Sequence, residues 1–199
     1  MSASARVDRI RTGQRALHVL AVCGSLRAKS KNRALLEAAE LLAPAYARIT
    51  LDWSLAALPH FNPDLDTLDG DKIPSEARRW RESVGKADGL LISSPEYAHG
   101  IPGVLKNALD WLVSSTTFPG KPVALLGAST MSVYAPEQLR EILTTMNARF
   151  VSEASIAVPV PGASGSAASI AADPELAGML RRALEAFVRT IEDRVRLEG

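Results

Sequence analysis

Short apolar runs alternate with amphipathic segments along the chain from Ala16 onward. The runs are apolar almost without interruption, which is typical of strands that are buried on both faces of a parallel sheet. They predict strands over residues 16–23, 47–53, 88–93 and 122–126, and a fifth strand near 151–158.

Between these runs, apolar residues recur at helical spacing, and the predicted helices begin near residues 30, 74, 102, 136 and 173. Serine and aspartate are favoured N-caps and proline is favoured in the first turn, as at Ser30, at Pro74 and at the Asp173-Pro174 pair. The last helix carries an apolar stripe made of Leu176, Leu180, Leu184, Phe187 and Ile191.

Strands that alternate with helices indicate a doubly wound α/β domain. Five such strands favour a flavodoxin-like three-layer sandwich, with a parallel sheet in the order 2-1-3-4-5 and helices on both faces. In this arrangement the ligand lies beyond the carboxyl ends of the strands, in the crevice between the first and third strands. Residues 1–15 are expected to form a flexible tail and 16–199 a single domain, in which 159–169 is a loop.

Composition narrows the possible functions. The chain has 199 residues, is 47% hydrophobic and carries a formal net charge of +1, which argues against nucleic-acid or membrane-surface binding through bulk charge. Cys23 is the single cysteine, so neither an intrachain disulfide nor a structural metal site is expected. The amino-terminal segment lacks a signal-peptide pattern and no run has the length of a membrane span, so we expect a cytoplasmic protein.

The loop that follows the first strand, GSLRAKSKN over residues 24–32, has the features of an anion site. It leads into a helix N-terminus, where unpaired N–H groups and the helix dipole stabilise a phosphate. Ser25 and Ser30 add hydroxyl donors, Asn32 an amide and Arg27 a planar guanidinium. Neither G-x-G-x-x-G nor a P-loop pattern is present, so a terminal monophosphate fits better than a dinucleotide pyrophosphate.

Two other interpretations of this loop are open. Small tyrosine phosphatases place a nucleophilic cysteine at the end of the first strand and an arginine six positions later. Here the sixth position after Cys23 is Lys29, which lacks the bidentate fork, and Arg27 stands at the fourth. Cys23 is then a buried strand residue. The loop is alternatively a solvated basic turn that binds nothing.

A second loop, SSPEYAHGIPG over residues 93–103, follows the third strand and lies across the same predicted crevice. Residues 24–33 match G-S-x-R-x-x-S-x-N-R at every fixed position, and residues 95–111 match P-E-Y-N-x-x-x-P-G-x-L-K-N-A-x-D-W except at Ala98. On these two motifs, and on the segment 118–129, the chain resembles the NADPH-dependent FMN reductase family of flavodoxin-like quinone and chromate reductases.

The resemblance implies an FMN-binding domain and a set of contacts. The residues that would hold the FMN phosphate are Ser25, Arg27, Ser30 and Asn32. Those that would edge the isoalloxazine ring, largely through backbone groups, are Pro95, Glu96, Tyr97 and Ala98. Ala128 and Ser129 would approach the flavin from the other side.

The resemblance also implies a reaction. Hydride would pass from NADPH or NADH to FMN and then to a small oxidant such as a quinone, chromate, an azo compound or a nitro compound, with ping-pong kinetics. The cofactor performs this chemistry, so no catalytic side chain is assigned. An FMN-binding electron carrier and a flavin-donating reductase for a monooxygenase are the alternatives, although the near-zero net charge is unlike that of the acidic flavodoxin carriers.

Several positions depart from the family pattern or allow two roles. Ala98 replaces an asparagine, and the bulky segment 130–134 replaces a glycine-rich run. His99 is either a general acid or an ordinary loop residue, and Trp111 is either core or subunit contact. The Lys106–Asp110 spacing also fits a simple ion pair. Family members form homodimers or homotetramers, for which the loop 54–71 is the candidate contact.

Overall fold

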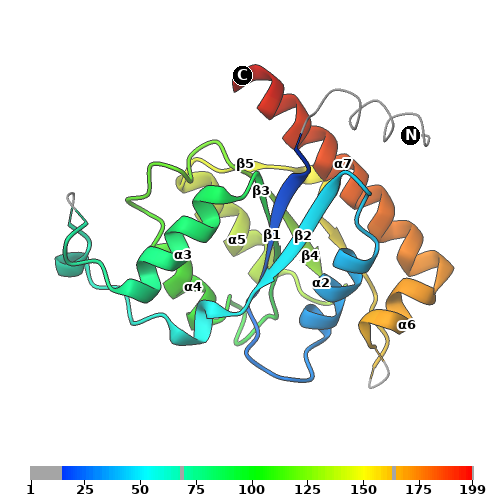
Figure 1. The fold of residues 1–199 in the computed structure, drawn as a ribbon. Helices are drawn as coiled ribbons and strands as arrows, with labels where there is room; N and C mark the ends of the chain where they lie inside the picture. Colours follow the sequence, from blue (N-terminus) through cyan, green and yellow to red (C-terminus); the bar gives the residue numbers. More distant parts are fainter. Residues whose placement is uncertain (1–14, 68–69, 163–164, 199) are drawn as a thin grey trace.

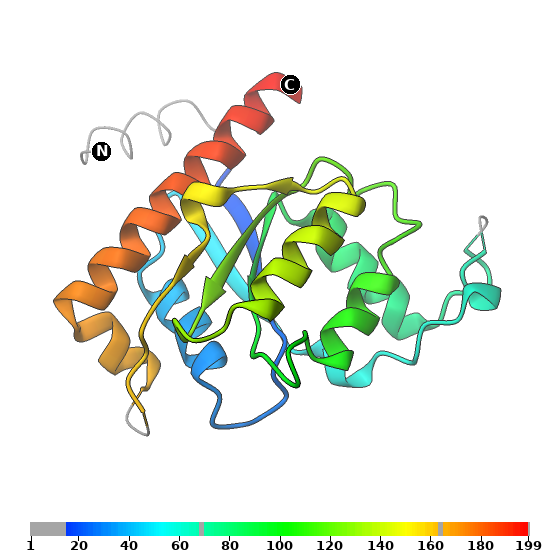
Figure 2. The same ribbon diagram turned by 180° about the vertical axis from the view of Figure 1, so that it is seen from behind.

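The computed structural model describes residues 15–67, 70–162 and 165–198, and its parallel sheet has the order β2-β1-β3-β4-β5. This is the predicted flavodoxin-like sandwich (Figures 1 and 2). The strands are β1 (Leu17–Cys23), β2 (Ala47–Asp52), β3 (Gly89–Ser93), β4 (Pro122–Gly127), β5 (Arg149–Phe150) and β6 (Ile156–Ala157). The α-helices are α2 (Lys31–Leu41), α3 (Ser75–Lys86), α4 (Gly103–Asp110), α5 (Tyr134–Thr145), α6 (Ala167–Ala172) and α7 (Pro174–Glu198).

The core divides into one apolar cluster on each face of the sheet. Successive side chains of β1 point to opposite faces, so Val19 and Ala21 pack with α2 and α7, whereas Leu20 and Val22 pack with α3, α4 and α5. The predicted stripe of α7 is buried along its whole length. Both faces of the sheet are therefore covered, as the continuous apolar runs predict.

The fifth strand differs from its prediction. The segment near 151–158 forms two short pieces, β5 and β6, each paired with β4 and separated by the 3-10 helix η3 (Ser152–Ala154). Ser155 accounts for the interruption, because its Oγ accepts from the Leu125 N–H (3.1 Å) and donates to the Val151 carbonyl (2.8 Å). A side chain thus replaces part of the strand ladder.

The segment 159–169, predicted to be a loop, contains the start of α6. Ser166 caps this helix through a reciprocal capping box with Ser169. Ile170, which is buried, is the helix's apolar anchor. This segment of serine, alanine and glycine has no apolar pattern at helical spacing, so the capping serine is the sequence feature that indicates the helix.

The long loop after β2 contains the 3-10 helices η1 (Ser54–Ala57) and η2 (Pro63–Leu65) and is bound to α4. The Trp111 Nε1–H and the Asn107 Nδ2–H both donate to the Pro59 carbonyl (2.8 and 3.0 Å), and Asn107 Oδ1 accepts from the Phe61 N–H (2.7 Å). Trp111 is fully buried and meets the edge of Phe61. It is core rather than a subunit contact, and Lys106 and Asp110 form the expected ion pair (2.6 Å).

The amino end of β3 is joined to the residues before β1. Of the predicted tail, residues 1–14 lie outside the described residues, whereas the Arg15 guanidinium donates to both carboxylate oxygens of Asp88 (2.7 and 2.6 Å). Asp88 also accepts from the His18 backbone N–H (2.8 Å). Burial acts to raise the pKa of Asp88, but these hydrogen bonds outweigh it and hold the pKa below its ordinary value.

We expect Asp88→Asn to lower the free energy of unfolding by about 1–2 kcal/mol at pH 7, because the native state loses a charge-assisted hydrogen-bond network. A carboxyl whose pKa is depressed on folding stabilises above its unfolded pKa, and this contribution is lost as the pH falls through the folded value. The difference between variant and wild type in urea titrations should therefore shrink below pH ~4. Asp64→Asn, at an exposed carboxylate, is the control. A stability difference between Asp88→Asn and wild type that persists at low pH would contradict the depressed pKa of Asp88.

Candidate functional site

The carboxyl ends of β1 and β3 bring the two motif loops into contact. The Gly24 N–H donates to the Ser93 carbonyl (2.8 Å). A Cβ at Gly24 would lie 2.8 Å from Ser94 Oγ and 3.1 Å from Leu105 Cδ2, so a side chain there would force both neighbours to move. Glycine at this point leaves room for the Ser94 and Leu105 side chains beside the two strand exits.

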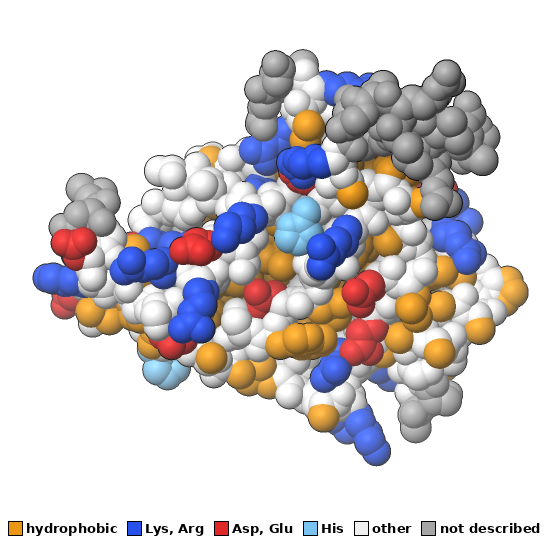
Figure 3. Space-filling view, in the orientation of Figure 1, with side chains coloured by type: hydrophobic (Ala, Val, Ile, Leu, Met, Phe, Trp, Pro, Cys, Tyr) orange, Lys and Arg blue, Asp and Glu red, His pale blue; other side chains and the backbone are white. Residues whose placement is uncertain are grey.

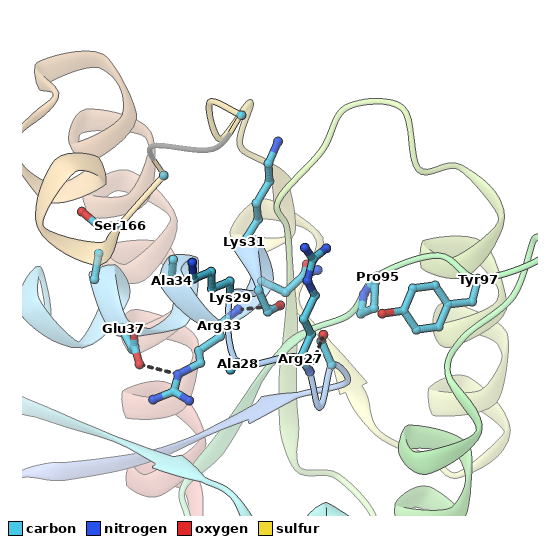
Figure 4. Close-up of a pocket in the computed structure, with 16 residues that line it drawn as sticks. Arg27, Ala28, Lys29, Lys31, Arg33, Ala34, Glu37, Pro95, Tyr97 and Ser166 are labelled. Carbon is cyan, nitrogen blue, oxygen red and sulfur yellow. Dashed lines mark hydrogen bonds and ion pairs between the residues drawn. The ribbon is translucent and has the colours of Figure 1, made fainter.

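A cavity of about 940 Å³ opens at this junction (Figure 4). The predicted site residues that line it are Ser25, Arg27, Ser30, Asn32, Pro95 and Tyr97. Residues outside the predicted set of site residues also line it, namely Ala28, Lys29, Lys31, Arg33, Ala34, Glu37, Gly162, Gly165, Ser166 and Ala167. One cavity therefore joins the first loop, the second loop and the start of α6.

Hydrogen bonds within the first loop leave several donors available to a ligand. Ser30 is the N-cap of α2, accepting from the Arg33 N–H (3.4 Å), and Ser25 Oγ accepts from the Arg27 N–H (3.3 Å). Asn32 Oδ1 accepts from the buried Ser93 hydroxyl (2.9 Å). Ser25 and Asn32 are only 7% and 8% exposed, yet among the described residues the Ser25 hydroxyl and the Asn32 amide N–H find no acceptor. An anion in the cavity would supply a hydrogen-bond acceptor for both donors.

The cavity wall is strongly basic. Arg27, Lys29, Lys31 and Arg33 line it, and Glu37 is the acidic residue among its lining side chains. Arg33 Nε pairs with Glu37 Oε1 (2.7 Å), whereas none of the described acidic residues forms an ion pair with the other three cations. Lys and Arg side chains project at the lower edge of the molecule, where the first loop lies (Figure 3). Together with the N-terminus of α2, this charge favours a phosphate.

The second loop is a tight hairpin whose conformation accounts for the family's asparagine. Tyr97 and Gly100 exchange backbone hydrogen bonds (2.9 and 3.0 Å), and the two residues between them, Ala98 and His99, have φ values of 49° and 58°. Two central residues with positive φ make a type I′ turn, where asparagine and glycine are favoured. The asparagine that Ala98 replaces therefore suits the backbone at this position.

Four predicted site residues, Glu96, Ala98, Ala128 and Ser129, do not line the cavity. Ala98 lies in the turn described above. Glu96 Oε2 instead accepts from the Ala135 N–H (3.0 Å) at the start of α5. Ala128 is buried. Ser129 Oγ accepts from the Met131 N–H (3.1 Å), and this serine lines a separate cavity of about 620 Å³ beside α5. Direct contacts from these residues to a flavin stay predictions.

The segment 130–134 is tied to the second loop by contacts that the sequence did not reveal. The His99 ring stacks on Tyr134 with centroids 4.2 Å apart. The Ile101 N–H donates to Gln138 Oε1 (2.8 Å) in α5. Met131, by contrast, is 85% exposed. The departure from the family's glycine-rich run was the signal in the sequence. Tyr134 connects this segment to the second loop.

Cys23 has the character of a core residue. Its side chain is 4% exposed and its Sγ donates to the Ser25 carbonyl (3.5 Å). Burial raises the pKa of this thiol despite opposing hydrogen bonds. A protonated, enclosed thiol is a poor nucleophile, which argues against the phosphatase interpretation.

Within the described residues, no helix combines the length and apolarity needed to cross a bilayer. The same part of the chain contains no cluster of three histidine, cysteine or acidic side chains placed to hold a metal ion.

Fold and cavity together define a flavodoxin-like protein with a basic loop at the switch point of its sheet. Comparison with known proteins is more specific, since residues 17–161 match the profile of the NADPH-dependent FMN reductases. The chain belongs to this family.

Named relatives agree with this membership. An NAD(P)H-dependent FMN reductase of Pseudomonas aeruginosa is 41% identical over 115 residues, covering 57% of this chain and 60% of that protein. A quinone reductase of Escherichia coli is 35% identical over 138 residues, covering 66% and 72%. The solved flavoenzyme NAD(P)H:acceptor oxidoreductase of Paracoccus denitrificans aligns with a TM-score of 0.73 and 28% identity, over 89% and 98% of the two chains. The match to the first of these relatives spans about three fifths of its length.

We expect Ala98→Asn and Ala98→Gly each to raise the free energy of unfolding by about 0.5–1 kcal/mol, because alanine is strained at positive φ. Glycine has no Cβ, and the asparagine side chain stabilises this backbone conformation through local hydrogen bonds. Chemical denaturation measures the effect. Ala98→Val is the matched opposite and should destabilise, since a β-branched side chain tolerates this conformation least. Equal stability of all four proteins would mean that the turn carries no such strain.

Proposed function

We propose that this protein is an FMN-dependent NAD(P)H oxidoreductase that passes electrons to a small oxidant such as a quinone. The observation that carries the proposal is the basic cavity in which the two family motifs meet, with the unpartnered donors of Ser25 and Asn32 on its wall. A phosphate monoester is dianionic or nearly so at neutral pH. Its oxygens would accept from these donors and from Arg27.

The residues present fit an FMN molecule. Its phosphate would be held by Ser25, Arg27, Ser30 and Asn32, at the N-terminus of α2. Its ring system would be edged by Pro95, Glu96, Tyr97 and Ala98, with Ala128 and Ser129 approaching from the other side. Glu96 acts through its backbone in this arrangement, because its carboxylate is occupied at the start of α5.

When bound, FMN accepts hydride from a reduced nicotinamide and delivers electrons to an oxidant. The chain's own contribution is to bind the cofactor and to leave access for the second reactant. Tyr97 is 55% exposed beside the cavity, so that side is open to solvent. No acid or base from the protein is required, which fits a site whose polar groups serve phosphate binding.

Relatives support the choice of substrates. The names of the Pseudomonas and Escherichia proteins specify NAD(P)H, FMN and quinone reduction. A Burkholderia relative, 38% identical over 122 residues, is a 2-hydroxy-1,4-benzoquinone reductase. We extend these activities to this chain, and include chromate, azo and nitro compounds as oxidants because an accessible reduced flavin discriminates little among them.

We further propose that the protein acts in the cytoplasm, where its nicotinamide cosubstrate is kept reduced, and that it assembles as a homodimer or homotetramer. The loop 54–71 is the candidate contact: Phe61 anchors it to Trp111, while Asn62, Pro63 and Asp64 are exposed. Analytical ultracentrifugation of the FMN-loaded protein tests the oligomeric state, and a fully active monomer would contradict the proposed assembly.

The experiment that tests the function loads purified protein with FMN and follows its visible absorption. We expect the bands of bound flavin to bleach on anaerobic addition of NADPH and to return with a quinone. Steady-state NADPH oxidation with quinone and no partner protein separates this enzyme from an electron carrier. Rapid reduction of free FMN combined with weak retention would point to a flavin-donating reductase. Failure to bind FMN contradicts the proposal.

Arg27→Ala should weaken FMN binding by about 10- to 100-fold, the effect of losing a hydrogen bond between two charged groups. No described acidic side chain pairs with Arg27, so the fold should be unaffected. Quenching of FMN fluorescence measures the dissociation constant. Arg79→Ala, at a 72% exposed arginine on α3, is the charge-matched control. Equal affinity of Arg27→Ala and wild type for FMN would contradict the proposed binding of the FMN phosphate by the first loop.

A further inference from the structure

The first loop carries more positive charge than one cofactor phosphate needs. A phosphate monoester has a charge of about −1.5 to −2 at pH 7, whereas Arg27, Lys29 and Lys31 line the cavity without an acidic partner among the described residues. Lys29 and Lys31 stand at positions that the family motif leaves open. The motif therefore does not assign these two lysines to the FMN phosphate, and they provide charge for a second anion.

The cavity also has room beyond the first loop. Its volume of about 940 Å³ is near the upper end of the usual range for small-molecule sites, about 300–1,000 Å³. Figure 4 shows Tyr97 at one end and Ser166 at the other, with the first loop between them. Lys29 extends toward Ala34 and the Ser166 end, away from Tyr97.

Lys31 is hydrogen-bonded to another segment beside the cavity. Its Nζ donates to the Val160 carbonyl (3.1 Å), which draws this ammonium group to the segment that precedes α6. An ammonium has three donors, so this bond leaves others for a ligand. Lys29 makes no hydrogen bond within the described part of the chain and is free to turn toward the same ligand.

We propose that Lys29 and Lys31 bind the 2′-phosphate of NADPH and so make this protein prefer NADPH to NADH. This inference rests on the proposed function. The nicotinamide has to reach the flavin ring beside Tyr97, and the 2′-phosphate stands on the adenosine ribose, at the far side of the dinucleotide. Lys29 extends away from Tyr97, and Lys31 is bonded to the segment before α6, which suits that phosphate better than the pyrophosphate in the middle of the molecule.

A binding experiment isolates the phosphate from turnover. We would titrate FMN-loaded protein with 2′,5′-ADP and with 5′-AMP, which differ by the 2′-phosphate, using calorimetry. Two largely exposed ion pairs should make 2′,5′-ADP bind about five- to tenfold more tightly. The double variant Lys29→Gln/Lys31→Gln should lose this difference. Glutamine at position 31 keeps a donor for the Val160 carbonyl, and Lys86→Gln, on α3, is the control at a lysine outside the cavity.

Kinetics supply the second measurement. The ratio of kcat/KM for NADPH to that for NADH, both measured at saturating FMN, should fall about five- to tenfold in the double variant. Equal loss for both dinucleotides would assign the lysines to the pyrophosphate or to general attraction and overturn the proposal. A weaker FMN dissociation constant with an unchanged ratio would assign them to the cofactor phosphate and overturn it too.

The two proposals fail in distinguishable ways. If wild-type protein binds FMN but oxidises neither dinucleotide, the proposed activity fails, and the calorimetric comparison of 2′,5′-ADP with 5′-AMP still decides the lysine site. If NADPH and NADH are oxidised equally well and the two adenosine phosphates bind equally, the activity stands and the lysine site is excluded.

Discussion

The close contact between the carboxyl ends of β1 and β3 is the constraint on which the candidate site depends. The Gly24 N–H donates to the Ser93 carbonyl (2.8 Å), and a Cβ at Gly24 would crowd the Ser94 side chain. The Ser93 hydroxyl then binds Asn32 in the first turn of α2. One strand end thus positions a helix N-terminus that belongs to the other strand's loop. Without this pairing, the two motifs would have no common cavity.

Many side chains of the second motif hold neighbouring segments of the fold in place. Asn107 and Trp111 hold the long loop after β2, Glu96 caps α5, and position 98 serves a turn with positive φ. The groups left to meet a ligand are hydroxyls, amides and cations of the first loop. Such a division explains why a motif can be specific while few of its side chains take part in chemistry.

The sequence predicted the fold closely because parallel strands buried on both faces leave a strong apolar signal. It also placed six of the proposed contacts in one cavity, since a strand order fixes which loops share an edge; these are Ser25, Arg27, Ser30, Asn32, Pro95 and Tyr97. Local side-chain bonding was harder to foresee. Ser155 divides the fifth strand and Ser166 starts α6 through hydrogen bonds that leave no periodic trace. The His99–Tyr134 stack joins residues far apart in sequence, and nothing in either segment alone specifies it.

The cavity and the carboxyl end of α7 lie at opposite edges of the sheet (Figure 1). The Arg15–Asp88 bond holds the start of β1 at that same far edge. Both ends of the described chain therefore leave the domain on the side away from the first and second loops. Because of this arrangement, the protein can be tethered to an electrode or fused to another enzyme through either end while the first and second loops stay directed into solution.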